Sequence, residues 1–98
     1  MIHALKIKPE YFKAVANLNK LFEVRKADRP FRVGDYLALN EIDDCGVYTG
    51  ACILAKISYI LDYPAYLQEG YVVLGLTSNG VIINTKRYTD TDEEENET

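Results

Sequence analysis

The residues with the clearest chemical potential lie in a short segment where charged and apolar side chains alternate. Glu23 and Arg25 are two residues apart, so on a strand they share one face, and Lys20 precedes them. Arg25 offers a planar fork of donors that suits phosphate or a base edge, whereas Lys20 offers a mobile point charge. The Glu23 carboxylate is an acceptor and could bind an exocyclic amine, as Glu binds N4 of cytosine. These residues predict a small basic cleft for a nucleotide-like ligand. A purely structural Glu23–Arg25 ion pair is the alternative.

Aromatic residues divide into candidates for ligand stacking and candidates for the core. We expect Tyr36 and Tyr48 to be stacking platforms for a base, a contact worth about 1–3 kcal/mol. Tyr11, Tyr59 and Tyr71 are expected in the core, where their rings would bury large apolar areas.

Other polar residues carry weaker functional signals. Turn chemistry around Asp28 and Arg29 favours loop bracing, and ligand binding by Arg29 is the alternative. His3 has no matched catalytic partner in the sequence and is expected to be a satisfied strand residue. The spacing of Cys45 and Cys52 matches no redox or zinc pattern, and His3 is the single histidine. We therefore expect no metal and no cofactor.

The charge distribution is uneven along the chain. The net charge is −4, but six acidic residues fall within residues 88–98. Eleven basic and nine acidic residues precede Tyr88, so residues 1–87 form a mildly basic body with net charge +2. Such a body is compatible with RNA or nucleotide binding. The tail has too few apolar residues to fold alone, and we predict that residues 88–98 are disordered and that residues 90–98 are mobile.

Length and hydropathy bound the class of protein. Ninety-eight residues suffice for one domain. No apolar run approaches the roughly 18 residues of a membrane-spanning helix, and the N-terminus lacks the apolar stretch of a secretory signal. We expect a cytoplasmic protein that does not enter the membrane, and the sequence leaves its oligomeric state open.

Hydrophobic periodicity predicts one helix and six strands. Pro9 suits the first turn of a helix, and apolar residues recur at helical spacing over residues 9–18. The helix is expected to end near Asn17 or Asn19, which tolerate the left-handed conformation. Period-two patterns predict strands at residues 3–8, 21–26, 36–41, 49–61, 71–77 and 81–86. Leu37 and Leu39 are expected to point inward.

The predicted elements indicate an α+β protein. Asn79 and Gly80 separate the last two strands, which is a strong signal for a tight hairpin. A sheet with so many strands in a short chain tends to close on itself. The expected fold is therefore a small β-barrel of about six mostly antiparallel strands with one short N-terminal helix.

Several segments, taken in order, resemble the ASCH domains, which are PUA-like β-barrels. The resemblance rests first on Lys-x-x-Glu-x-Arg at residues 20–25, followed by Gly34-Asp35. A bacterial and phage branch of that family adds His-x-Leu-Lys-Ile, Pro-x-Tyr-Phe, Tyr-Thr-Gly and Gly-Tyr-Val-Val, here at residues 3–7, 9–12, 48–50 and 70–73. The match spans residues 3–76. The glycine that precedes the lysine in the family is Leu18 or Asn19 here.

The resemblance implies RNA or nucleotide binding, by analogy with PUA domains. Some ASCH proteins hydrolyse N4-acetylcytidine with a lysine, a threonine and a later glutamate. Lys20 matches the lysine, Glu23 stands at the threonine position, and Glu69 is the nearest counterpart of the glutamate. The second hypothesis is thus an amidohydrolase for acylated nucleosides, with Lys20 as base assisted by Glu23. A protein-interaction or regulatory module is the third.

Overall fold

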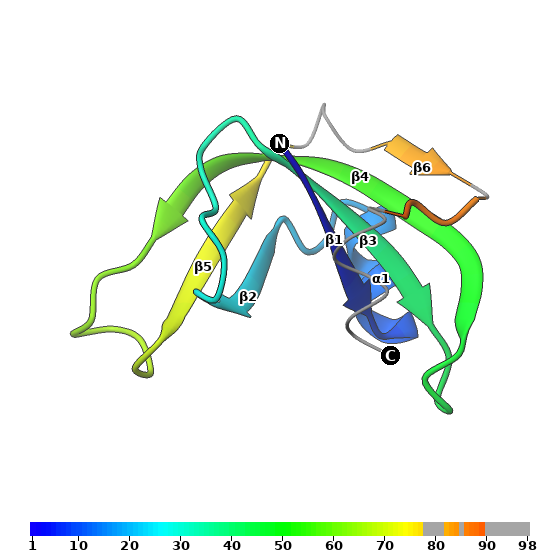
Figure 1. The fold of residues 1–98 in the computed structure, drawn as a ribbon, viewed down its shortest axis with the longest axis horizontal. Helices are drawn as coiled ribbons and strands as arrows, with labels where there is room; N and C mark the ends of the chain where they lie inside the picture. Colours follow the sequence, from blue (N-terminus) through cyan, green and yellow to red (C-terminus); the bar gives the residue numbers. More distant parts are fainter. Residues whose placement is uncertain (78–81, 85, 90–98) are drawn as a thin grey trace.

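The computed structural model describes residues 1–77, 82–84 and 86–89, and it confirms the α+β composition. The elements follow the predicted order with boundaries shifted by one or two residues at most positions (Figure 1). They are β1 (Ile2–Ile7), α1 (Pro9–Ala16), β2 (Phe22–Lys26), β3 (Tyr36–Ile42), β4 (Tyr48–Leu61), β5 (Tyr71–Leu76) and β6 (Ile82–Asn84). Pro9 begins α1, as its fixed φ and missing N–H predict.

The strands form one strongly curved sheet with the order β1-β3-β4-β5-β2. β1 runs parallel to β3, and the other pairings are antiparallel. The 14-residue β4 bends across the molecule (Figure 1). Its pairing register with β5 shifts between Ile57 and Tyr59. The sheet does not close into a barrel, because β1 and β2 are its two end strands and do not pair with each other. The expectation of a closed barrel is therefore not met.

The core lies on one face of β1, β3 and β4 and continues onto β5. Leu37 and Leu39 are fully buried, as predicted, and Val15 is the buried residue of α1. The cluster comprises Leu5, Ile7, Val15, Leu37, Leu39, Ile53, Ala55, Ile57, Val72, Leu74 and Leu76. This packing holds β1, one end strand of the sheet, on one side of the molecule. On the other side it holds β5, which pairs with the second end strand, β2.

A tight helix cap sets the direction of the chain as it leaves α1. Leu18 has a φ of 62°, so the left-handed residue after the helix is a leucine. The sequence had predicted Asn17 or Asn19 for this position. The Leu18 N–H donates to Val15, and the Asn19 N–H donates to Ala14, which is the Schellman pattern. Glycine usually occupies this left-handed position. The cap turns the chain directly into Lys20.

The pairing of β6 differs from the predicted hairpin. β6 pairs with β4 through Leu54↔Ile82 and its neighbours, and not with β5. The Thr77 N–H donates to the Lys56 carbonyl, so the chain follows β4 past the end of β5 and resumes along it at Ile82. The predicted Asn79-Gly80 turn lies outside the described residues.

The C-terminal end of the described chain contacts the sheet at Asn40. The buried Asn40 amide donates to the Tyr88 carbonyl (2.9 Å) and accepts from the Tyr88 N–H (3.0 Å). A single side chain thus satisfies both polar groups of one residue, as a neighbouring strand would. The predictions for residues 90–98 fall on residues that the structure does not describe.

The remaining expectations about class concern membranes, metals and cysteines. No helix among the described residues is long and apolar enough to cross a membrane. The same residues contain no group of three or more His, Cys, Asp or Glu side chains placed to hold a metal ion. Cys45 is exposed in the turn between β3 and β4, and Cys52 is buried in β4.

Candidate functional site

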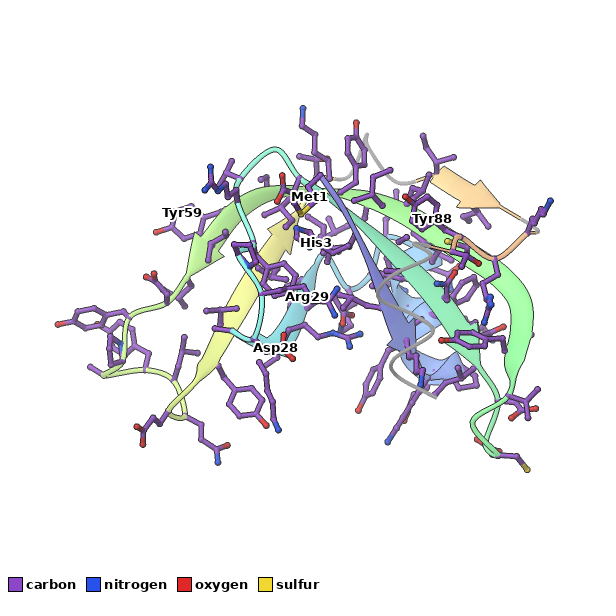
Figure 2. All side chains as sticks on the ribbon, in the orientation of Figure 1. Met1, His3, Asp28, Arg29, Tyr59 and Tyr88 are labelled. Atoms are coloured by element: carbon purple, nitrogen blue, oxygen red, sulfur yellow. The ribbon has the colours of Figure 1, made fainter. Side chains whose placement is uncertain are left out.

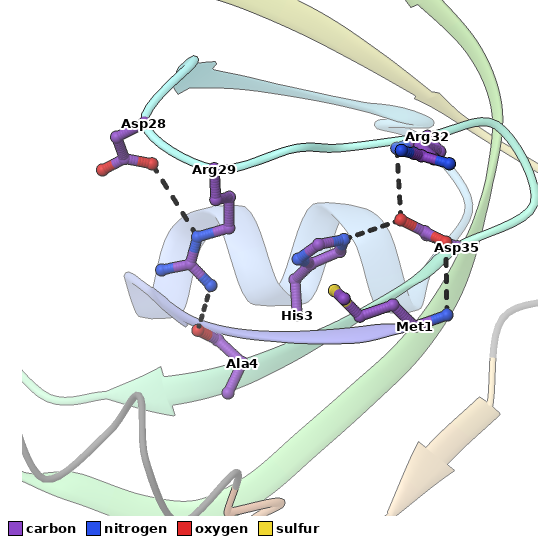
Figure 3. Close-up of polar contacts among 7 residues, drawn as sticks. All are labelled: Met1, His3, Ala4, Asp28, Arg29, Arg32 and Asp35. Atoms are coloured by element: carbon purple, nitrogen blue, oxygen red, sulfur yellow. Dashed lines mark hydrogen bonds and ion pairs between the residues drawn. The ribbon is translucent and has the colours of Figure 1, made fainter.

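The two end strands of the sheet are joined by arginine side chains across the gap between β1 and β2, which we call the seam. Arg25 Nη2 donates to the Lys6 carbonyl at 2.6 Å. Arg29 Nη1 lies 3.4 Å from the Ala4 carbonyl (Figure 3). Alternate carbonyls of an end strand point away from its neighbour, so Ala4 and Lys6 offer their oxygens to the seam.

The three residues singled out from the sequence meet at this seam. Glu23 is only 4% exposed, and its two carboxylate oxygens contact different cations. Lys20 Nζ donates to Glu23 Oε1 and also to the Phe22 carbonyl, the latter at 2.7 Å. Arg25 Nε donates to Glu23 Oε2 at 3.1 Å. The predicted cluster of Lys20, Glu23 and Arg25 is therefore present, with the carboxylate at its centre.

In β2 the apolar face is exposed to solvent and the face that carries Glu23 points inward, which is the reverse of the usual arrangement. Phe22 and Val24 share a face, as the period predicts, but they are 45% and 51% exposed. Glu23 occupies the inward face, because Lys20 and Arg25 compensate the cost of burying its charge. An exposed apolar face next to a paired carboxylate gives this end of the sheet both hydrophobic and polar surface.

A cleft of about 590 Å³ opens beside this cluster, and we call it the apolar cleft because most of its surface is apolar. Tyr11, predicted to be core, is 46% exposed and lies on the wall of this cleft. Lys20 Nζ lies 5.4 Å from the Tyr11 ring centre and 4.9 Å from that of Phe22. The walls comprise Lys6, Ile7, Lys8, Tyr11, Lys20, Phe22, Glu23, Val24 and Arg25.

A second hollow of about 380 Å³ shares Lys6 and Arg25 with the apolar cleft, and we call it the basic hollow. Arg29 belongs to it, with its Nε 3.7 Å from Asp28 Oδ1 (Figures 2 and 3). Arg29 thus braces the loop, as predicted, and also lines a cavity. The walls comprise Leu5, Lys6, Arg25, Lys26, Asp28, Arg29 and Phe31.

The structure does not bring the two tyrosines chosen as stacking platforms into either cavity. Tyr48 packs against Arg87, whose guanidinium carbon lies 4.0 Å from the ring centre. Tyr36 is half-buried at the start of β3. Tyr59, predicted to be core, is 65% exposed and projects from β4 (Figure 2). Tyr71 is half-buried on β5. Tyr11 and Phe22 are the aromatic residues that the apolar cleft exposes.

His3 takes part in a buried polar cluster that the sequence did not reveal. Its Nε2 is 2.8 Å from Asp35 Oδ2 (Figure 3). Its ring meets that of Phe31 edge-on, with 4.8 Å between the ring centres. Asp35 also accepts from the Met1 amino group at 3.2 Å and from the Arg32 N–H at 3.1 Å. His3 is satisfied only in part, because its Nδ1 is buried and has no hydrogen-bond partner among the described residues. Its partner Asp35 lies 32 residues away, so no local pattern could indicate the pair. The cluster ties β1 to the loop before β3.

These contacts change the acid–base behaviour of Asp35. The hydrogen bond from His3 lowers the pKa of Asp35 below its ordinary value of 3.8, and the Met1 amino group and the Arg32 N–H act in the same direction against the opposing effect of burial. The ionised form is therefore favoured in the folded state more than in the unfolded chain.

Acid is accordingly expected to weaken the fold through Asp35. In the interval between the two pKa values the unfolded chain binds more protons, so the free energy of unfolding falls as pH decreases from about 5 through the folded-state pKa. Urea unfolding at a series of pH values should show this slope, and Asp35→Asn should remove part of it. The exposed Asp44→Asn is the matched control. Equal slopes in the parent and in Asp35→Asn would contradict the assignment.

Glu69, the nearest counterpart of the later glutamate in the ASCH proteins that hydrolyse acetylcytidine, lies away from the cluster of Lys20, Glu23 and Arg25. It is exposed and lines a small cavity with Asp62, Pro64 and Tyr71, and it borders neither the apolar cleft nor the basic hollow. The described site thus offers Lys20 and Glu23 for chemistry but not the third residue.

Comparisons with known proteins cover the segment that carries the seam. The family model described as "Domain of unknown function (DUF3850)" matches residues 2–76, which run from β1 through β5. A relative from Escherichia phage P2, described as an "Uncharacterized 12.9 kDa protein in GpA 3'region", is 38% identical over 73 residues. That alignment covers 74% of this chain and 65% of the phage protein.

Proposed function

Since the chain belongs to the DUF3850 family, whose match includes every residue of the apolar cleft, we propose that this cleft is a binding site for RNA or a nucleotide-like ligand. The observation that carries the proposal is the buried Glu23, held between Lys20 and Arg25 at the edge of the cleft. We further propose that the domain is a cytoplasmic PUA-like module of the ASCH type. The sequence motifs and the six-strand, one-helix composition support that relationship.

The apolar cleft offers the contacts that a nucleobase requires. Tyr11 and Phe22 expose rings on its wall, and a base can stack on such rings whatever its sequence. The carboxylate of Glu23 has about four acceptor positions, so the bonds from Lys20 and Arg25 leave capacity for an exocyclic amine. A base bearing such an amine, for example cytosine, is therefore the ligand type that this cleft favours.

Lys20 provides the test of this proposal. Parent protein should bind some members of a panel of nucleosides, nucleotides and short RNAs, measured by thermal shift and then by calorimetry. Lys20→Ala should weaken the affinity about three- to tenfold, because it removes one cation and leaves Glu23 and the stacking rings. The exposed Lys13→Ala on α1 is the control. A parent protein that binds no member of the panel would refute the proposal.

An amidohydrolase acting on an acylated nucleoside is the second candidate. It is favoured by one observation, the direct contact between Lys20 Nζ and Glu23, which are the two residues that such chemistry would use. Acetate release from N4-acetylcytidine measures it on the same variants. In a hydrolase Lys20→Ala should abolish turnover and leave substrate binding largely intact. Binding of acetylcytidine without acetate release from the parent protein would eliminate this candidate.

A further inference from the structure

We propose that the basic hollow binds the phosphate group of a nucleotide whose base occupies the apolar cleft. This inference rests on the proposed function and adds a second subsite with a different chemical preference. The two cavities share Lys6 and Arg25, so they lie side by side along the seam. A nucleotide likewise carries its base and its phosphate at different positions of the ribose.

The charge of the basic hollow suits an anion. Four cationic side chains line it, and Asp28 is the one acidic residue among its walls. Asp28 is 65% exposed and lies 3.7 Å from Arg29, so water screens much of its charge. The apolar cleft also has four cations and one acid among its walls, but its acid, Glu23, is buried and contacts two of the cations, Lys20 and Arg25. The hollow contains no buried carboxylate among its walls, so its positive charge is less compensated.

Two arginines of the basic hollow are held in position before any ligand binds. Arg25 is fixed by Glu23 and by the Lys6 carbonyl, contacts that use its Nε and Nη2. Its Nη1 forms no hydrogen bond with the described residues, and it can therefore donate to a ligand. Arg29 is held near the Ala4 carbonyl. Guanidinium groups that are held before binding lose less side-chain freedom when they engage phosphate.

Lys26 is the third contributor and the residue best suited to a test. It ends β2 and is exposed, and its side chain forms no hydrogen bond or ion pair with the part of the chain that the structure describes. Its ammonium is not needed to hold the seam together. A change at Lys26 should therefore affect an anionic ligand without disturbing Glu23 or the base-binding rings.

The experiment compares ligands that differ only in phosphate. Affinities of cytidine, cytidine 5′-monophosphate, cytidine 3′-monophosphate and a short cytidine-containing RNA are measured by calorimetry at low ionic strength. We expect at least one phosphorylated ligand to bind about tenfold more tightly than cytidine. Lys26→Gln should remove most of that gain and leave cytidine binding unchanged. Lys56→Gln, which removes an exposed cation of β4 outside both cavities, should leave the gain intact.

The outcomes separate this inference from the proposed function. Cytidine binding with no gain from phosphate would overturn the phosphate subsite and leave the base site standing. Equal losses in Lys26→Gln and Lys56→Gln would also overturn it, because the gain would then come from overall charge. If no nucleoside binds, a titration with inorganic phosphate is followed by amide chemical shifts. Shifts confined to the walls of the basic hollow, at residues 5–6 and 25–31, support the subsite, and their absence overturns it. A monophosphate gain indicates a free nucleotide, whereas a gain limited to the oligomer indicates an RNA strand.

Discussion

Arg25→Ala is expected to lower both the stability of the protein and its affinity for a nucleotide-like ligand. The side chain donates to Glu23 and to the Lys6 carbonyl, so alanine leaves a buried carboxylate with one cation and removes the link between β2 and β1. Because the guanidinium is partly exposed, we expect the free energy of unfolding to fall by about 2 kcal/mol. Ligand affinity should fall by at least tenfold, because Arg25 borders both cavities.

Arg25→Lys should recover little of the stability and ligand affinity that Arg25→Ala loses. A point charge can approach Glu23 or the Lys6 carbonyl, but it lacks the fork that contacts both. Urea unfolding and calorimetry on Arg25→Ala and Arg25→Lys measure the two effects, and Arg32→Ala, whose side chain is exposed, is the control. If Arg25→Ala keeps parental stability and parental affinity, the seam contacts have no energetic importance and the site lies elsewhere.

Glu23→Ala should have the largest effect on stability. It removes the carboxylate that compensates Lys20 and Arg25, both of which are mostly buried, and it leaves their charges close together. Breaking a buried pair from one side costs about 3–5 kcal/mol, and partial exposure of the two cations places this case near 3 kcal/mol. Glu23→Gln should be milder, because the amide oxygen still accepts one of the two hydrogen bonds.

Chemical denaturation of the parent, Glu23→Ala and Glu23→Gln provides the measurement. Glu69→Ala removes an exposed glutamate and is expected to change stability by less than about 0.5 kcal/mol. If Glu23→Ala is as stable as Glu69→Ala, water solvates the uncompensated charges of Lys20 and Arg25. The cluster would then not stabilise the seam.

Local patterns predicted the elements well, because periodicity and turn chemistry are properties of adjacent residues. The helix beginning at Pro9 and the long strand ending at Leu61 follow directly from such patterns. The period also placed Glu23 and Arg25 on one face of β2. It could not say which face is inward, since that depends on partners that lie elsewhere in the chain. Tyr11 and Tyr59 were misplaced for the same reason.

Pairing between distant segments could not be predicted from the sequence. The parallel pairing of β1 with β3 joins residues 34 positions apart, and nothing in residues 2–7 specifies that partner. The Asn79-Gly80 pair predicted a hairpin, but β4 is long enough for β5 and β6 to pair with successive parts of it. The bond between His3 and Asp35 and the Arg25 contact with the Lys6 carbonyl likewise depend on how the sheet curves.

The open seam also bears on self-association of this protein. An end strand with available carbonyl groups is a template on which another chain can add a strand, and such addition leads to aggregation. Arg25 and Arg29 direct their guanidinium groups at carbonyls on that edge of β1, and their charges oppose the approach of a hydrophobic strand. The two arginines therefore protect against aggregation at high protein concentration, and this role is independent of any ligand. Variants made at the seam to alter binding would carry an added risk of insolubility.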